Sequence, residues 1–293
     1  MKVKVYAKLN LTLNVGEKQG KYHAIDSVVT SINVCDVVEV NYRSDKQVTV
    51  NGTPTVEVER NTAYRAACAF IEAFDTCGAD ITIDKGIPFG SGLGGSSADA
   101  AATLYCLCKL QKIDMGCEKL LKICETVGSD VTFMLLGGSG RLRGKGDWVE
   151  SFVLHSPIYF ALTTFEQELN SGEVYATYDK LTPGCPNAAI KSQYTCSNEH
   201  ILTLLQQGDN ERALACFSND LQRAAILISD YAEQYLHFAK ANGLNPVMTG
   251  SGSAYYIAFT NLTAAEEAVK LLNSRGFNSL LCQSLPQGIE IIE

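Results

Sequence analysis

The first fifteen residues alternate between apolar and polar positions. The odd-numbered positions from Val3 to Val15 are apolar, whereas lysine, tyrosine, asparagine and threonine occupy the even-numbered ones from Lys2 to Asn14. A period of two is typical of a β-strand that buries one face and exposes the other. Further strands are predicted at 36–42, 48–51 and 81–84. The polar stretch between the first two of these favours an antiparallel sheet.

Three helices are predicted in the N-terminal half. Asn61 or Thr62 can cap the first helix, which runs to about Phe74. The other two helices are expected at 97–110 and 118–127.

The C-terminal half mixes strands and helices in the same way. Its predicted strands lie at 158–165, 254–259 and 278–282. Its predicted helices lie at 199–206, 210–217, 229–242 and 264–275. A glycine-rich turn is expected at 138–147 and a mobile surface loop at 182–198. This order of elements indicates an α+β fold.

Chain length, net charge and apolar content exclude several classes of protein. At roughly 150 residues per domain, a chain of 293 residues indicates two domains, with a boundary near 150–157. A formal charge of −8 and an apolar content of 46% argue against a disordered chain and against a nucleic-acid binder. No apolar run reaches the roughly 18 residues of a membrane span, so no membrane partner is expected.

Cysteine usage bears on the compartment. The 11 cysteines include no C-x-x-C pair. They predict mostly reduced, buried thiols and a cytoplasmic location. The alternating N-terminus lacks the continuous apolar run of a secretion signal, so the mature chain is expected to begin at Met1.

The strongest chemical signal is the segment 87–101, which passes from a predicted strand through four glycines into an alanine-rich helix. Glycines allow close approach to the backbone, and the free N–H groups of a first helical turn bind anions, most often phosphates. Ser96 and Ser97 add hydroxyl groups. A tight connector whose serines merely cap the helix is the alternative.

Two other phosphate motifs fit less well. A Walker A loop requires Gly-Lys-Ser/Thr, but Lys145 is followed by Gly146. The G-x-G-x-x-G spacing of dinucleotide-binding folds occurs at Gly90, Gly92 and Gly95. However, no second strand ends in an acidic residue about 20 positions later. A nicotinamide-dependent oxidoreductase is therefore the weakest alternative.

A second glycine loop, at 248–254, leads into the predicted strand at 254–259. Alone, such a loop is more often a hairpin turn than a ligand site. Two glycine loops in one chain favour a bound phosphorylated ligand.

These loops resemble those of the GHMP kinase superfamily, named for galactose, homoserine, mevalonate and phosphomevalonate kinases. Residues 88–98 resemble its phosphate loop, P-x-x-x-G-L-G-S-S-A, and residues 249–254 resemble its C-terminal glycine loop. Four further segments resemble the family of kinases that act on 4-diphosphocytidyl-2-C-methyl-D-erythritol: 7–13, 20–25, 128–133 and 219–221.

The resemblance implies a two-domain α+β fold. Residues 1–152 would form an N-terminal ATP-binding domain of the ribosomal S5 domain 2 type, and residues 153–293 a C-terminal ferredoxin-like domain. The implied reaction transfers the γ-phosphate of ATP to the 2-hydroxyl of the family's substrate, with Mg²⁺ bridging the phosphates, in the non-mevalonate route to isoprenoids. The implied partner is a small molecule, a cytidine diphosphate derivative of a methyl polyol, and the enzyme would be a monomer or homodimer.

The resemblance also implies roles for individual residues. Asp130 would be the base and Lys8 its charged partner, because a carboxylate can accept the hydroxyl proton and an ammonium can stabilise the developing oxyanion. ATP would be bound by Asn61, Lys85, Pro88, Gly90, Gly92, Leu93, Gly94, Gly95, Ser96 and Ser97. The acceptor substrate would be bound by Asn10, Tyr22, His23, Tyr175, Gly250, Ser251 and Gly252. Metal ligands are not assigned.

Other interpretations stay open at this point. Lys8 can lie on the solvated face of the first strand, and Asp130 can cap a short helix. The chain can also be a superfamily kinase for another alcohol, such as homoserine, threonine or a sugar, or a non-catalytic nucleotide-binding protein of the same fold. The Tyr22-His23 pair argues against another alcohol, and the presence of both Lys8 and Asp130 argues against a non-catalytic protein.

Overall fold

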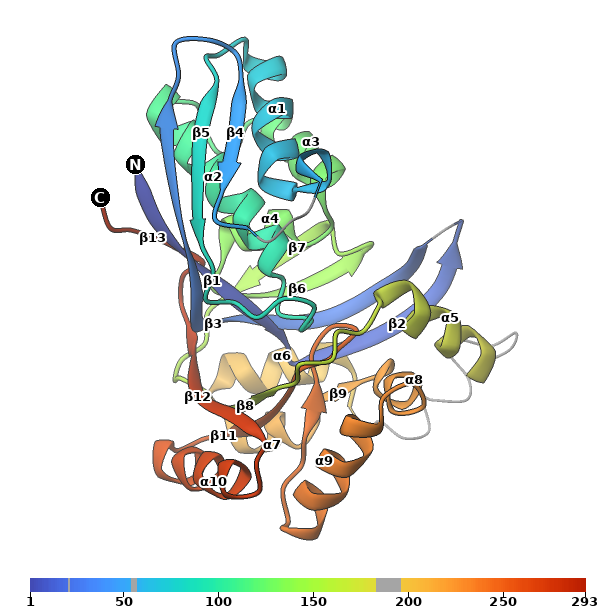
Figure 1. Cartoon of the computed structure of the whole chain (residues 1–293). Coiled ribbons are helices and arrows are strands. Elements are labelled where there is room, and N and C mark those ends of the chain that lie inside the picture. Colours follow the sequence, from blue (N-terminus) through green and yellow to red (C-terminus); the bar gives the residue numbers. More distant parts are fainter. Residues whose placement is uncertain (21, 54–56, 183–195) are drawn as a thin grey trace.

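The computed structural model describes residues 1–20, 22–53, 57–182 and 196–293. Most of the loop predicted at 182–198 lies outside the described residues. The two ends of the chain lie close together (Figure 1), because strand β13 (Ile289–Ile291) pairs antiparallel with strand β1 (Lys2–Asn10).

Within the described residues, thirteen strands form one connected sheet. Its main path runs in the order β10 (Val247–Met248), β11 (Tyr255–Phe259), β8 (Tyr159–Thr164), β12 (Asn278–Leu285), β3 (Tyr22–Tyr42), β1 and β13. The strands off this path are β2 (Thr12–Gln19), β4 (Val48–Asn51), β5 (Ala79–Asp84), β6 (Ser139–Gly144), β7 (Trp148–Phe152) and β9 (Ser218–Asn219).

The long strand β3 organises this sheet, because it pairs with β1, β2, β5, β6 and β12. Ser284 of β12 lies opposite Ile32 of β3, which joins the C-terminal half of the chain to the N-terminal half. The sheet thus continues across the boundary predicted after residue 152, and that boundary stays a prediction.

Four helices and one 3₁₀ turn pack in the N-terminal half: η1 (Val58–Arg60), α1 (Thr62–Phe74), α2 (Gly95–Gln111), α3 (Glu118–Val127) and α4 (Val131–Leu136). Asn61 caps α1 as predicted, since its side chain accepts hydrogen bonds from the backbone N–H groups of Ala63 and Tyr64. Helix α2 is buried from Ala98 to Leu104, which fits its run of alanines. The three predicted helices are confirmed, with α2 beginning two residues earlier than expected.

The helices of the C-terminal half are α5 (Ser171–Leu181), α6 (Asn198–Gln207), α7 (Asn210–Leu214), α8 (Gln222–Ile226), α9 (Asp230–Ala241) and α10 (Leu262–Ser274). The predictions for α6, α9 and α10 are confirmed to within two residues at each end. The sequence did not predict α5 or α8. In Figure 1, α5 lies alongside the tip formed by β2 and the start of β3.

Two clusters of buried apolar side chains form the core. The larger one gathers β1, β3 and the helices of the N-terminal half, and it also includes residues of α6, β8 and β11 from the C-terminal half. The smaller one centres on Val174 and Tyr178 of α5, Tyr235 of α9 and Tyr255 of β11. Leu13 of β2 belongs to the smaller cluster, so β2 ties the two halves together.

Three expectations about strands are wrong. The predicted first strand ends at Asn10, and a separate strand begins at Thr12. Strand β4 pairs parallel with β5 and has no pairing with β3, because β5 occupies the edge of β3 that a hairpin would have used. The glycine-rich segment 138–147 contains strand β6, whose residues pair with β3.

The cysteines agree with the expectation in part. Eight described cysteines are free thiols, but Cys196 and Cys216 are joined by a disulfide. Four of the free thiols are buried: Cys106, Cys108, Cys124 and Cys282. No helix in the described ranges has the length and apolar character needed to cross a membrane.

Candidate functional site

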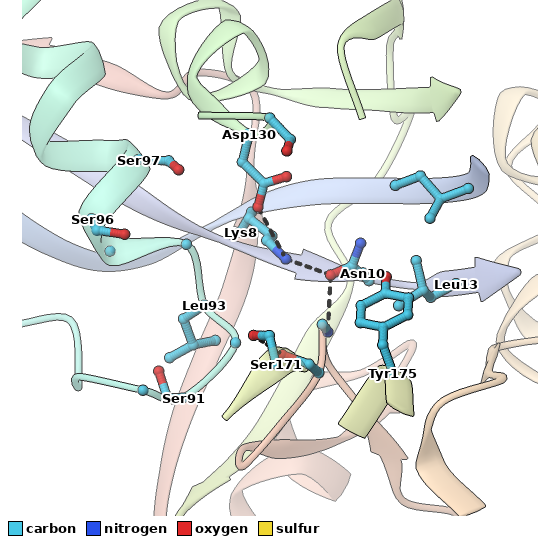
Figure 2. A pocket seen from close by; sticks show the side chains of 18 of the residues that line it. Lys8, Asn10, Leu13, Ser91, Leu93, Ser96, Ser97, Asp130, Ser171 and Tyr175 are labelled. Carbon is cyan, nitrogen blue, oxygen red and sulfur yellow. Dashed lines mark hydrogen bonds and ion pairs between the residues drawn. The ribbon is translucent and has the colours of Figure 1, made fainter. Parts of the chain in front are cut away.

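A cavity of about 630 Å³ opens between the two glycine loops, β1, the tip of β2 and β3, and α5. Figure 2 shows this cavity with Lys8 and Asp130 on one side and Tyr175 on another. All of the predicted site residues line it except Asn61 and Gly252. The cavity therefore brings together residues that are far apart in the sequence, from Lys8 to Ser251.

The first glycine loop leads directly into the N-terminus of α2. Gly90, Gly92 and Gly94 have φ values of +59°, +76° and +79°, a region that other residues rarely adopt. A Cβ atom at Gly94 would lie 2.2 Å from the Cε atom of Met134, so the end of that side chain would have to move. The first residues of α2, Gly95, Ser96 and Ser97, line the cavity, and the free N–H groups of a first helical turn can bind an anion.

The two glycine loops pack backbone against backbone. A Cβ atom built at Gly92 would lie 2.3 Å from the carbonyl oxygen of Thr249, and one at Gly250 would lie 2.9 Å from the carbonyl oxygen of Gly92. The Ser253 N–H donates to the Gly90 carbonyl at 3.2 Å. Each loop therefore fixes the position of the other.

Lys8 and Asp130 meet at the floor of the cavity. The Lys8 Nζ atom lies 3.6 Å from Asp130 Oδ2. Lys8 is only 4% exposed, so it does not lie on a solvated strand face. Asp130 occupies the N-cap position of α4, but its side chain makes no capping hydrogen bond. The carboxylate is thus free to face the cavity, as Figure 2 shows.

Asn10 links this pair to the second glycine loop. Its Oδ1 atom accepts hydrogen bonds from Lys8 Nζ at 2.5 Å and from the Gly250 N–H at 3.0 Å. Its Nδ2 group donates to Ser27 Oγ at 2.8 Å. Every polar atom of the Asn10 side chain is used, so Asn10 holds the Lys8 ammonium in place.

An aromatic group lines the part of the cavity between α5 and the tip of β2 and β3. The rings of His23 and Tyr175 stack with centroids 5.2 Å apart. Burial raises the pKa of Tyr175 to about 12, so its hydroxyl stays neutral. Tyr22 is 60% exposed, and the Lys145 ammonium lies 5.4 Å from the centre of its ring.

Beneath the first glycine loop, Lys85 joins two buried carboxylates. Its Nζ atom donates to Asp36 Oδ2 at 2.5 Å and to Asp99 Oδ2 at 2.8 Å. Burial raises the pKa of Asp99 to about 7, and the nearby Lys85 ammonium opposes that rise only in part. Lys85 lines the cavity and lies 5.1 Å from the centre of the exposed Phe89 ring.

Two predicted site residues lie outside the cavity lining. The side chain of Asn61 is engaged as the cap of α1 and donates to Thr53 Oγ1 at 3.3 Å. Gly252 packs against Leu169 and Met248, where a Cβ atom would lie 2.9 Å from the Leu169 side chain. Their predicted roles in binding ATP and substrate stay predictions.

Four residues that line the cavity or support its lining were not predicted from the sequence. Asp179 and Lys18 line the aromatic end of the cavity, and Asp36 and Asp99 support Lys85. A helix over 171–181 would have put Tyr175 and an acidic residue one turn apart, but that helix was not predicted. For the other three residues no local pattern gives a signal.

The described residues contain no group of three or more His, Cys, Asp or Glu side chains that could hold a metal ion. Mg²⁺ bound to a nucleotide needs fewer protein ligands, because phosphate and water oxygens supply most of its coordination. Ser96, Ser97 and Asp130 line the cavity and offer oxygen atoms of the kind that Mg²⁺ prefers. The donor set therefore fits a nucleotide-borne Mg²⁺ but not a separate metal centre.

Comparison with known proteins gives a consistent family. The model of the GHMP kinases N terminal domain matches residues 61–138. A 4-diphosphocytidyl-2-C-methyl-D-erythritol kinase from Cutibacterium acnes is 34% identical over 265 residues, covering 85% of this chain and 83% of that protein. Another from a Thermoanaerobacter species is 31% identical over 301 residues, covering 100% and 99%.

Solved structures agree with the sequence relatives. A crystal structure of 4-(cytidine 5'-diphospho)-2C-methyl-D-erythritol kinase matches with a TM-score of 0.75 and 25% identity, covering 97% of this chain and 100% of that one. A homoserine kinase from Cytophaga hutchinsonii also has a TM-score of 0.75, at 20% identity, covering 100% and 97%. The homoserine kinase shows likeness of fold alone. The predicted α+β fold of GHMP kinases is confirmed.

Proposed function

The chain belongs to the 4-diphosphocytidyl-2-C-methyl-D-erythritol kinase family, and from that premise we propose that it transfers the γ-phosphoryl group of ATP to the 2-hydroxyl of 4-diphosphocytidyl-2-C-methyl-D-erythritol. This reaction belongs to the non-mevalonate route to isoprenoids. The observation that carries the proposal is the meeting of Lys8 and Asp130, 3.6 Å apart, between a phosphate-binding loop and an aromatic group.

In the proposed reaction, Asp130 accepts the proton of the substrate hydroxyl as the oxygen attacks the γ-phosphorus. The Asp130 carboxylate makes no capping hydrogen bond to α4 and lines the cavity, which supports this role, because a base must face the group that it deprotonates. The Lys8 ammonium stabilises negative charge on the attacking oxygen and on the transferred group. Asn10 keeps that ammonium from turning away.

The phosphates of ATP would lie along residues 90–97, where backbone N–H groups of the glycine loop and the N-terminus of α2 can bind an anion. Mg²⁺, when bound with ATP, would neutralise phosphate charge, and Ser96 and Ser97 offer oxygen donors that would hold it. The second glycine loop closes this side, since Gly92 and Gly250 leave no room for side chains between the loops.

The other end of the cavity suits a cytidine diphosphate. Tyr175 and Tyr22 offer rings on which a base can stack, and His23 offers ring nitrogens for hydrogen bonds. The proposal includes a division into domains at 1–152 and 153–293 and a cytoplasmic enzyme that acts as a monomer or homodimer without nucleic acid or membrane.

The proposal is tested by following ADP release from Mg-ATP with 4-diphosphocytidyl-2-C-methyl-D-erythritol, homoserine, threonine and mevalonate in parallel. We expect turnover of the cytidylyl substrate alone, and a fall in kcat of about 10²- to 10⁴-fold in Asp130→Asn. Asp84→Asn, an exposed carboxylate on β5 outside the cavity, is the matched control and should keep normal activity.

The two alternative functions predict different results. Turnover of another alcohol would overturn the substrate assignment while keeping the roles of Lys8 and Asp130. Binding of ATP without turnover of any of the four compounds would favour a non-catalytic nucleotide-binding protein. Full activity of Asp130→Asn would remove the proposed base.

A further inference from the structure

Three charged or polar side chains from three elements meet at the aromatic end of the cavity. Asp179 on α5 accepts a hydrogen bond from Lys18 Nζ of β2 at 2.6 Å and contacts His23 Nε2 of β3 at 2.7 Å. All three residues line the cavity. Asp179 therefore makes polar contacts between α5 and the β2–β3 tip, which lie side by side in Figure 1.

The orientation of the His23 ring is fixed from three sides. Tyr175 stacks on one face, with an angle of 19° between the ring planes. Tyr178 meets His23 edge-on, with centroids 6.3 Å apart and planes at 90°. Asp179 Oδ1 lies 2.7 Å from Nε2. A ring held in this way presents its remaining nitrogen, Nδ1, in one direction.

The chemistry of Asp179 decides which nitrogen carries hydrogen. Partial burial opposes ionisation of Asp179, but the hydrogen bonds from Lys18 and His23 outweigh it and hold the pKa of the carboxyl below its usual value. An ionised carboxylate only accepts hydrogen bonds, so Nε2 of His23 must be the donor. In the neutral ring Nδ1 then has a lone pair, and no residue in the described part of the chain makes a hydrogen bond to it.

We propose that Asp179 is a positioning residue that keeps Nε2 of His23 protonated, so that Nδ1 accepts a hydrogen bond from the exocyclic amino group of a cytosine base. The proposal rests on the proposed function in one respect, that the acceptor substrate carries a cytidine diphosphate. Cytosine presents an amino donor where uracil presents a carbonyl acceptor. The Asp179–His23 pair would therefore select cytidine over uridine nucleotides.

Asp179→Asn tests this role with almost no change of shape. The amide has one acceptor and one donating group, and Lys18 can only donate. The amide oxygen would therefore face Lys18 and the NH₂ group would face Nε2, which moves the ring hydrogen to Nδ1. A donor at Nδ1 opposes the amino group of cytosine and suits the carbonyl of uracil.

The experiment measures dissociation constants of CDP and UDP by isothermal titration calorimetry without ATP. We expect the preference of the unmodified protein for CDP to fall roughly ten- to hundredfold in Asp179→Asn, because a buried polar group loses its partner. Glu173→Gln, an exposed carboxylate on the same helix that does not line the cavity, should keep the preference.

Nitrogen-15 NMR of the imidazole supplies a second readout, assigned by its loss in His23→Gln. We expect hydrogen on Nε2 in the unmodified protein and on Nδ1 in Asp179→Asn, which a purely structural role of Asp179 would not produce. Equal preference for CDP in the unmodified protein and in Asp179→Asn, or hydrogen on Nδ1 in the unmodified protein, would overturn the proposal.

Neither readout needs turnover, so the two proposals can fail separately. A chain that prefers CDP through Asp179 but phosphorylates none of the alcohols tested would lose the proposed function and keep this inference. A kinase whose Asp179→Asn variant still prefers CDP would lose this inference alone.

Discussion

Among single residues, Lys8 is the one at which the effect of charge on catalysis can best be measured separately from an effect on folding. Methionine matches the length of lysine but has no charge, and the partner carboxylate of Asp130 is 28% exposed and can be hydrated. We therefore expect Lys8→Met to fold normally, to bind ATP, and to lose about 10²- to 10³-fold in kcat. Steady-state kinetics of ADP release would measure this loss. Lys4→Met, on the same strand face but outside the cavity, is the control and should be fully active.

The same strand indicates how far individual residues can be predicted. The alternating pattern correctly predicted that Lys8 and Asn10 lie on the same face of β1, but it predicted that this face is exposed to solvent. The face is buried because Gly250, 240 positions later in the sequence, packs over Asn10. Their catalytic and binding roles came from resemblance to a family, since no local pattern records a contact over that distance. Neither a sequence pattern nor the resemblance to the family indicated a role for Asp179.

At the scale of elements, the packing of the two glycine loops makes a direct prediction. In Gly92→Ala, the new Cβ atom would lie 2.3 Å from the Thr249 carbonyl oxygen at a φ of +76°. We expect a loss of about 1–3 kcal/mol in the free energy of unfolding and a weaker ATP affinity, because the loops must move apart. Chemical denaturation and calorimetric titration with ATP would measure both effects.

Gly116→Ala is the matched control, because Gly116 lies in an exposed turn where the nearest atom would be 3.5 Å from the new Cβ atom. Equal stability and ATP affinity in the two variants would contradict the interlocked arrangement of the loops.

Elements with strong local signals were predicted best. Helix α1 follows from the capping side chain of Asn61, and α3 has the predicted bounds Glu118–Val127. The long strand β3 was recognised only over 36–42, because most of its pairing partners come from distant parts of the sequence. The glycines of segment 138–147 predict a turn, but pairing with β3 stabilises a strand there. Local pattern therefore predicts helices with caps, while sheet partners need the whole chain.

For the whole molecule, the buried cluster of Lys85, Asp36 and Asp99 couples the sheet to helix α2. Asp36 belongs to β3, Lys85 directly follows β5, and Asp99 lies in the second turn of α2. With both carboxylates ionised the cluster carries a net charge of −1, which burial disfavours. Protonation of Asp99 makes the cluster neutral, so Asp99 should contribute to a dependence of the stability of the whole fold on pH.

The sign of that dependence follows from the pKa of Asp99, which burial raises to about 7 from an ordinary value of 3.8. Between these values the folded chain keeps a proton that the unfolded chain has lost, so this contribution is complete below about pH 4 and is lost as the pH rises toward 7. Asp99→Asn cannot titrate there. We therefore expect the free energy of unfolding of the unmodified protein to fall relative to that of Asp99→Asn, by at most about 1.4 kcal/mol per pH unit. Urea denaturation of both proteins at pH 5, 6, 7 and 8 would measure the difference, with exposed Asp84→Asn as the control that should follow the unmodified protein. If the free energy of unfolding changed with pH in the same way for Asp99→Asn and the unmodified protein, Asp99 would be ionised in the folded chain throughout this range. The Lys85 ammonium would then compensate for two ionised carboxylates.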